Sequence, residues 1–351
     1  NRFITNDGAT IMLSVKTVHP VAKLVVEIAD RQEEKVGDGT TTAVVLAAEM
    51  IKEGKRLITD MGIHPTLIVR GIELGIQRSI ELFKQMAIKI NMEDAGLAQV
   101  ISTAAGSRMD GGQVVSLVGD ALGFLKKPNG KKGMINLKKS IFLINNPMLD
   151  DTVFDGIVIQ KQLFGQQIPD NLENTKVILL KIDLKEIEES LVKEMKNYDE
   201  IVRMKERQSK MTKEISDSIF KTGAGIVFMS SVHADEQLLS NLLEKNILMI
   251  HVSNEELLNI ANALDVQVVR RKEDMGGISV GTFKSVYYDD ENGLFFLENR
   301  VQRKMVTIII GGVTKVTSQE RWRTVKDGIS AAQSALNDGI VAGGGAVELC
   351  I

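Results

Sequence analysis

Cysteine is nearly absent from this sequence of 351 residues, because Cys350 is the only one. A single thiol cannot form an internal disulfide, so a disulfide-stabilised extracellular scaffold is excluded and we expect a reducing, cytoplasmic compartment. The four histidines are His19, His64, His233 and His251. They lie far apart in the sequence and lack metal-ligand spacing, so we expect no zinc site.

Aromatic residues are also scarce, at 4% of the chain, and no apolar run reaches the roughly 20 residues of a membrane-spanning helix. The 43 Lys and Arg nearly balance the 46 Asp and Glu, giving a net charge of -3. This balance lacks the basic excess of a nucleic-acid-binding protein. We therefore expect neither a membrane nor nucleic acid as a partner, and an α/β core built from small and branched aliphatic residues.

Hydrophobic periodicity divides the chain into helical and strand-rich regions. Residues 20–126 show apolar residues at helical spacing, and Pro20 and Pro65 stand where helices can begin because the first turn does not use its N–H groups. After this region, short apolar segments such as Ile141 to Ile144 and Val177 to Leu180 predict strands. The first region is therefore predicted to be a helical bundle.

The middle of the chain is predicted to be a separate unit inserted into the helical one. A polar, helix-favouring stretch covers residues 182–220, and strand and helix patterns alternate from Gly225 onward. A helical pattern resumes at Glu320. The predicted fold class is thus multidomain α and α/β, with a nested insertion.

Residues 37–42, Gly-Asp-Gly-Thr-Thr-Thr, form the strongest local motif. Glycines allow backbone amides to approach an anion closely, and the helix predicted to follow offers free N–H groups and the positive end of its dipole. Asp38 adds a carboxylate that can hold Mg²⁺ beside phosphate. A plain glycine turn with a threonine cap explains the same residues, and the pattern is neither a Walker motif nor a dinucleotide fingerprint.

Two further glycine-containing segments lie near the ends of the sequence. Asp7 belongs to Asn-Asp-Gly, which favours a tight turn. Residues 343–345 are consecutive glycines that follow an alanine-rich helical pattern containing Asp327. Such glycines permit close approach to a ligand, although a flexible joint accounts for them equally well.

The order of three motifs, NDGAT, GDGTTT and VKDGISAAQSALNDGIVAGGGAVEL, resembles the chaperonin family. The resemblance is strongest over residues 1–110 and 303–351, and it points to the thermosome and eukaryotic cytosolic type, including bacterial members of that type. The sequence begins at Asn1 and stops at Ile351 within an apolar pattern. We therefore expect a chain truncated at both ends.

The resemblance implies a helical equatorial ATPase domain, a small α/β intermediate domain and an α/β apical domain with a helical protrusion. The implied boundaries are 1–95 and 336–351 for the equatorial domain, 96–150 and 303–335 for the intermediate domain, and 151–302 for the apical domain, with the protrusion near 182–220.

The resemblance also implies roles for individual residues. Asp327 would orient the attacking water, Asp7 would lie near the γ-phosphate, and Asp38 would hold Mg²⁺. Arg108 stands where the family commonly has a lysine that senses nucleotide, which keeps the charge but changes its reach. The remaining residues implied to bind ATP are Gly37, Gly39, Thr40, Thr41, Thr42, Gly343, Gly344 and Gly345.

The implied activity is ATP-dependent folding of unfolded proteins inside a self-assembled, stacked double ring. The extra segment at 182–220 implies a lid built into each subunit, with no separate co-chaperonin. Its methionines, among them Met195 and Met211, either offer an adaptable surface to unfolded chains or pack on their own domain. Two other functions are considered. A chaperonin-like scaffold that does not hydrolyse ATP is disfavoured by the presence of both Asp38 and Asp327, and a metabolic ATP-dependent transferase would require a small-molecule pocket signature that the sequence lacks.

Overall fold

The computed structural model describes residues 11–12, 14, 18–106, 111–125, 136–161, 172–181, 198–230, 236–299 and 305–351. The chain forms two compact units. The first contains residues 1–153 and 308–351, and the second contains Phe154–Thr307. Among the described helices, none combines the length and the apolar character needed to cross a membrane.

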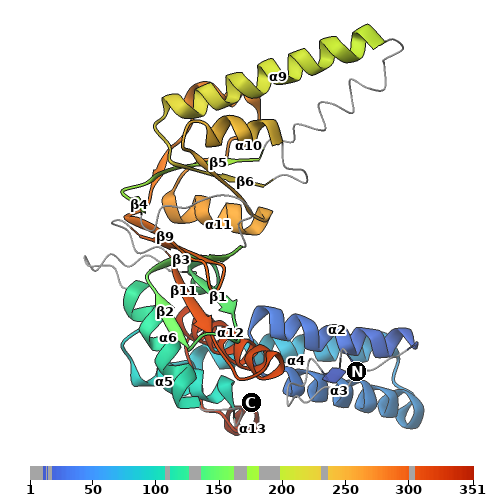
Figure 1. The fold of residues 1–351 in the computed structure, drawn as a ribbon. Coiled ribbons are helices and arrows are strands. Elements are labelled where there is room, and N and C mark those ends of the chain that lie inside the picture. Colours follow the sequence, from blue (N-terminus) through green and yellow to red (C-terminus); the bar gives the residue numbers. More distant parts are fainter. Residues whose placement is uncertain are drawn as a thin grey trace. The chain divides into compact units, whose positions relative to one another are not determined.

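The first unit begins with a series of helices (Figure 1). Prolines at the start of α2 and α4 follow His19 and His64, whose side chains accept backbone N–H groups of the first turn. Gly62 ends α3 in the left-handed conformation, with φ of 64°. The helices are α2 (Pro20–Lys35), α3 (Thr40–Met61), α4 (Pro65–Met86), α5 (Ala95–Ala105) and α6 (Gly111–Leu125).

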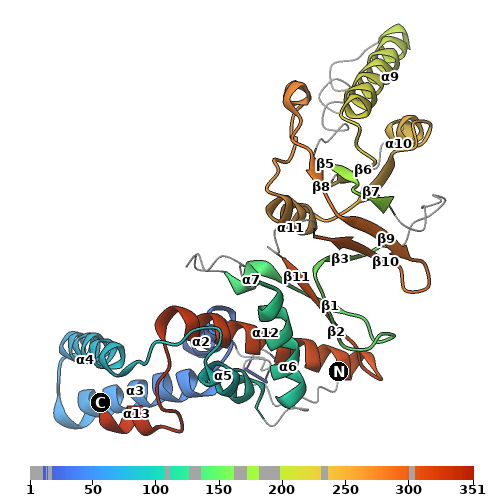
Figure 2. The same cartoon turned by 90° about the vertical axis from the view of Figure 1, so that its left-hand side faces the viewer.

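The rest of the first unit packs around one long helix, α12 (Lys315–Asp338), which is mostly buried over residues 324–335. It packs against α5, α6, α7 and β1, and Figure 2 shows it beside α5 and α6. A three-stranded sheet has the order β1-β11-β2. These other elements are α7 (Leu137–Ser140), β1 (Ile141–Asn145), β2 (Thr152–Phe154), β11 (Val306–Ile310) and α13 (Ala346–Cys350).

The second unit contains two four-stranded sheets. One is antiparallel, with the order β3-β10-β9-β4. The other has the order β7-β6-β5-β8, in which β5, β6 and β7 are parallel. The strands are β3 (Gly156–Gln160), β4 (Leu172–Glu173), β5 (Lys176–Leu180), β6 (Ile226–Met229), β7 (Leu248–His251), β8 (Gly281–Thr282), β9 (Ser285–Asp289) and β10 (Leu294–Glu298).

Helices cover both faces of the parallel sheet, as Figure 1 shows. Helices α9 (Tyr198–Lys221) and α10 (Glu236–Leu243) lie on one face, and α11 (Asn254–Leu264) lies on the other. Strands β5 and β6 are therefore almost continuously apolar. Met211 of α9 packs against the core of this unit. Of the two roles considered for the methionines, packing on their own domain is therefore the one observed for Met211. A short 3₁₀ helix covers Lys272–Gly277.

The multidomain α and α/β class is confirmed, and the predicted helix starts at Pro20 and Pro65 are confirmed as well. The helix predicted from Glu320 begins earlier, at Lys315, because Thr314 caps it by accepting the N–H of Thr317. Residues 182–197 of the expected protrusion lie outside the described residues, as does Met195. The further division of the first unit into equatorial and intermediate parts stays a prediction.

Candidate functional site

The glycine-rich loop lies between the end of α2 and the start of α3. Gly37 and Gly39 both have left-handed backbones, with φ of 77° and 74°. Residues with a Cβ rarely adopt this conformation, so the loop needs glycine at both positions. The Gln32 side chain donates to the Asp38 carbonyl at 2.9 Å, which holds the loop from its own helix.

The same loop packs directly against α12. A Cβ added to Gly37 would lie 2.4 Å from the Cβ of Ser330 and 3.1 Å from the carbonyl oxygen of Asp327. No side chain fits in this space. The structure therefore brings together two motifs that are far apart in the sequence.

Asp327 lies on the part of α12 that is packed from several sides. Its side chain is buried, with 8% of the residue exposed, and Ser330 follows one turn later on the same helix face. The next residue, Gly328, packs against α5 and α6: an added Cβ would be 3.2 Å from Ile101 and 3.4 Å from Val114. This packing holds Asp327 in a defined position beside the loop.

The start of α3 has the features of an anion-binding site. Gly39 is the N-cap and has no side chain to accept the N–H groups of the first turn. The first helical bond runs from the N–H of Ala43 to the Gly39 carbonyl at 2.9 Å. The preceding N–H groups and the exposed hydroxyls of Thr41 and Thr42 remain available to phosphate oxygens.

Asp38 is exposed, and one of its carboxylate oxygens accepts the N–H of Gly39 at 2.7 Å. A carboxylate is a hard oxygen ligand, and the loop around it offers N–H donors rather than further acidic side chains. Such a donor set fits a divalent cation that is bound together with phosphate, because phosphate oxygens supply the missing ligands. Within the described part of the chain, no group of three or more His, Cys, Asp or Glu could hold a metal by itself.

The remaining predicted site residues are not brought to this loop by any described contact. Residues 343–345 lie between α12 and α13, and an added Cβ at any of the three glycines would meet no atom within 4 Å. Gly344 and Gly345 have φ of 69° and 80°, so this turn also requires glycine. Asp7 and Arg108 lie outside the described residues.

Sequence reasoning missed three polar residues at the loop or at the helix end before it, Gln32, Lys138 and Ser330. It also missed Gln333, which binds the backbone next to Lys138. Ser330 could have been found, because it lies one helical turn after Asp327. Gln32, Lys138 and Gln333 carry no local motif, and only the packing of the helices shows where they are.

A polar hollow of about 570 Å³ lies elsewhere in the first unit, at the start of α12. Arg321 forms an ion pair with Asp151 there and donates to Gln113 at 2.9 Å, and Asp151 also accepts the N–H of Gly311 at 2.9 Å. These charged groups are paired with one another. The cluster ties the loop before β2 to α12 and is structural.

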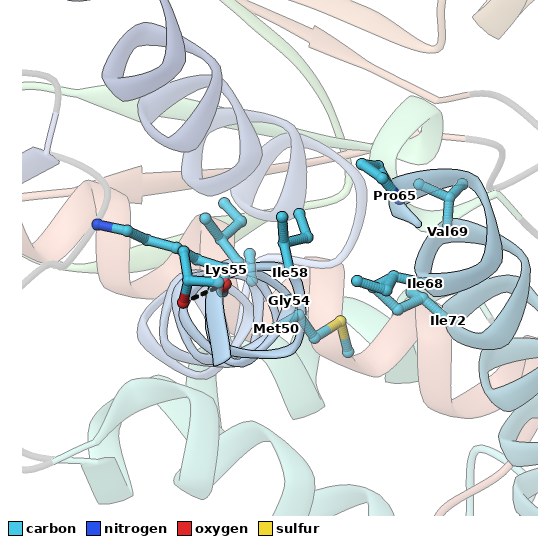
Figure 3. Close-up of a pocket in the computed structure, with 11 residues that line it drawn as sticks. Met50, Gly54, Lys55, Ile58, Pro65, Ile68, Val69 and Ile72 are labelled. Carbon is cyan, nitrogen blue, oxygen red and sulfur yellow. Dashed lines mark hydrogen bonds between the residues drawn. The ribbon is translucent and has the colours of Figure 1, made fainter. Parts of the chain in front are cut away.

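An apolar groove of about 530 Å³ separates α3 from α4 (Figure 3). Met50 and Ile58 of α3 point toward Ile68 of α4 across it. Neither helix contains a buried residue, although both have an apolar stripe. The facing apolar surfaces of α3 and α4 are therefore exposed and suited to contact with further protein.

Taken together, the nested insertion and the loop packed against the returning helix define a multidomain α and α/β protein with a candidate nucleotide site. The profile of the TCP-1/cpn60 chaperonin family matches residues 1–351. The chain therefore belongs to the TCP-1/cpn60 chaperonin family.

Curated relatives agree with this assignment. The chain is 30% identical over 362 residues to the thermosome subunit of Methanothermococcus thermolithotrophicus and 31% identical over 359 residues to that of Methanocaldococcus jannaschii. It is 31% identical over 360 residues to thermosome subunit alpha of Archaeoglobus fulgidus. Each alignment covers 99% of this chain and 65% of the relative, so the chain spans about two thirds of the relatives' length.

A solved structure supports the fold. The crystal structure of a group III chaperonin in the open state matches with a TM-score of 0.73 and 23% identity, over 97% of this chain and 68% of that one. The predicted resemblance to thermosome-type chaperonin subunits is confirmed by these comparisons.

Proposed function

We propose that this chain is part of an ATP-driven chaperonin that folds unfolded proteins. The observation that carries this proposal is the packing of Gly37 against the segment of α12 that contains Asp327 and Ser330. The glycine-rich loop and the helix segment that carries the buried Asp327 are thereby held next to each other. Family membership supplies the class of reaction, which is hydrolysis of ATP coupled to folding.

Each residue of the site has a role that follows from its chemistry. The N–H groups at the start of α3, with the hydroxyls of Thr40, Thr41 and Thr42, bind phosphate oxygens. The Asp327 carboxylate accepts a proton of the attacking water and orients it. Residues 343–345 allow the backbone to approach the nucleotide, and Asp7 and Arg108 contribute polar groups near its phosphates.

The Asp38 carboxylate is proposed to hold Mg²⁺. When bound with nucleotide, Mg²⁺ supplies positive charge that neutralises the phosphate oxygens. Asp38 is exposed, so a metal ion can reach its carboxylate from solvent. The bond from the Gly39 N–H fixes the orientation of this carboxylate on the loop. Its neighbours on the loop are glycines, which leave room for a bound metal–phosphate group.

The proposed domains are an equatorial ATPase domain (1–95 and 336–351), an intermediate domain (96–150 and 303–335) and an apical domain (151–302) with a protrusion near 182–220. We propose that the protein assembles into stacked double rings in the cytoplasm. The protrusions would close the cage without a separate co-chaperonin. The apolar groove between α3 and α4 supports assembly, because an exposed surface of this kind is typical of a region covered by other protein.

The test is a measurement of Mg²⁺-dependent ATP hydrolysis together with refolding of an unrelated denatured protein. We expect slow turnover and ATP-dependent refolding. Asp327→Asn keeps the size of the side chain but weakens its ability to accept a proton, so it should lower kcat by at least about 100-fold. Binding of ATP should remain within a few-fold of the unchanged protein.

The matched control is Asp338→Asn, which changes an exposed carboxylate at the end of the same helix. This variant should keep full activity. Binding of ATP without turnover in the unchanged protein would instead favour a non-hydrolysing scaffold. Turnover without refolding would favour a metabolic ATP-dependent transferase.

A further inference from the structure

Lys138, on the short helix α7, contacts the end of the helix that leads into the candidate phosphate loop. Its Nζ donates to the carbonyl oxygens of Glu34 at 2.6 Å and Lys35 at 2.9 Å. These are the last two residues of α2, and Gly37 follows after one more residue. The contact joins segments that are 103 and 104 residues apart.

The chemistry of this contact is favourable for a lysine. The last carbonyl groups of an α-helix have no partner within the helix, and the helix dipole places partial negative charge there. An ammonium group donates hydrogen bonds to these carbonyl groups and also places a positive charge next to the negative end of the dipole. Burial lowers the pKa of Lys138, and the nearby charge of Lys326 lowers it further, while Glu34 raises it. The Lys138 amine is thus partly withdrawn from water at this point.

The residue before Lys138 connects α7 to the helix that carries Asp327. The backbone N–H of Leu137 donates to Oε1 of Gln333, and this bond is buried. Gln333 is itself held on α12, where its Nε2 donates to Asn337 at 2.9 Å. Two consecutive residues of α7 therefore contact two different helices, α12 and α2.

We propose that Lys138 is a positioning residue for the glycine-rich loop and that α7 links this loop to α12. By contacting both helices, α7 fixes the distance between the end of α2 and the helix segment that contains Asp327. Gly37 packs on that segment directly, and Lys138 holds the chain just before it. The part of this inference that concerns ATP rests on the proposed function, and the part that concerns the loop does not.

The first measurement uses the protein without nucleotide. Lys138→Met removes the ammonium group and keeps most of the aliphatic stem. Hydrogen exchange of the peptide covering residues 33–42, followed by mass spectrometry, should become about threefold faster, as expected for loss of a charged hydrogen bond at a partly exposed site. Lys138→Arg should restore slow exchange, because a guanidinium also donates to carbonyl oxygens.

The second measurement separates loop positioning from a general structural effect. Lys138→Met should raise the KM for ATP about threefold, because Lys138 holds the end of α2 from which the binding loop starts. The kcat at saturating ATP should be nearly unchanged, because the variant keeps the bond from Leu137 to Gln333 on the helix that carries Asp327. Lys139→Met is the matched control, since Lys139 is the adjacent exposed lysine on the same helix. It should change neither quantity. Lys138→Gln provides a milder variant if the methionine variant does not fold.

The possible results distinguish the inference from the proposed function. Unchanged exchange in Lys138→Met, or equal acceleration in Lys139→Met, would overturn the inference. Faster exchange with an unchanged KM would show that Lys138 only caps α2, and this result would also overturn the inference. If the unchanged protein does not hydrolyse ATP, the proposed function fails, and the exchange experiment alone decides whether Lys138 positions the loop.

Discussion

Gly37 is the residue at which the candidate phosphate loop is most tightly constrained. Two independent restrictions act on it: a left-handed backbone with φ of 77° and the Cβ of Ser330 in the place where its own Cβ would be. The first restriction is local and follows from the turn. The second arises only because α12 returns to this point of the chain.

We predict that Gly37→Ala destabilises the first unit by about 2 kcal/mol, because the added methyl group is both strained and overpacked. Trp322 is the only tryptophan in the chain and lies on α12, so its fluorescence reports unfolding of this unit. Urea denaturation followed at this residue measures the change. Binding of ATP should weaken in the same variant, because the loop must move away from α12.

The control for this prediction is Gly71→Ala. Gly71 is exposed in the interior of α4, and an added Cβ would meet no atom within 4 Å. Alanine is the better helix former by roughly 0.8 kcal/mol, so this variant should be slightly stabilised. Equal destabilisation by both substitutions would show that Gly37 has no special role.

At the scale of secondary-structure elements, the strand pair β9–β10 contains a cluster of charged and aromatic side chains. Glu298 of β10 lies opposite Ser285 of β9. It accepts a hydrogen bond from the Ser285 hydroxyl at 2.7 Å and forms an ion pair with Lys284. The hydrogen bond from Lys284 lowers the pKa of Glu298 below its ordinary value of 4.5, and the Ser285 hydroxyl lowers it further.

This shift predicts a pH dependence of stability for the second unit. Because the pKa of Glu298 is lower in the folded state, its stabilising contribution is present above the ordinary value of 4.5 and is lost as the pH falls through the lower folded value. Glu298→Gln should therefore lower the melting temperature at pH 7. The difference between the variant and the unchanged protein should shrink as the pH falls below 4.5 and vanish once the pH lies below the lowered folded pKa.

Calorimetric scans across this pH range provide the measurement. Glu291→Gln changes an exposed carboxylate in the turn between the same two strands and should follow the unchanged protein at every pH. A difference between Glu298→Gln and the unchanged protein that does not shrink as the pH falls below 4.5 would contradict the assignment of the ion pair.

At the scale of the whole molecule, the apolar surface of α3 and α4 stands out. Both helices are long, and both leave large apolar side chains exposed, including Ile51 at 52% and Val69 at 55%. Contiguous exposed apolar surface of this kind is typical of regions that contact other protein. The thermosome relatives are longer than this chain, which spans 65% of their length.

We predict that the chain of 351 residues binds an environment-sensitive hydrophobic dye at this groove. Replacing both Ile51 and Val69 by glutamine should lower the dye fluorescence by roughly half, since the two side chains line the same groove. Glu49→Gln, an exposed change on α3, serves as the control. Undiminished fluorescence in the double variant would place the main apolar surface elsewhere.

Much of this protein could be predicted from its sequence. The helix starts at Pro20 and Pro65, the strands of the second unit and the nested order of the two units follow from local periodicity and turn residues. These signals are local because they depend on neighbours within one or two turns of the chain. The family resemblance likewise rests on short motifs, such as residues 37–42, whose spacing is visible without coordinates.

Tertiary structure alone decided which of these segments meet. Gly37 packs against Ser330, and Lys138 binds the end of α2. The local sequence of these segments does not predict either contact. An apolar stripe shows that a helix has a face to bury but does not identify what covers it. The stripes of α3 and α4 illustrate this, because the described structure leaves both exposed. Contacts between distant segments depend on the packing of the whole unit, which no single window of sequence contains.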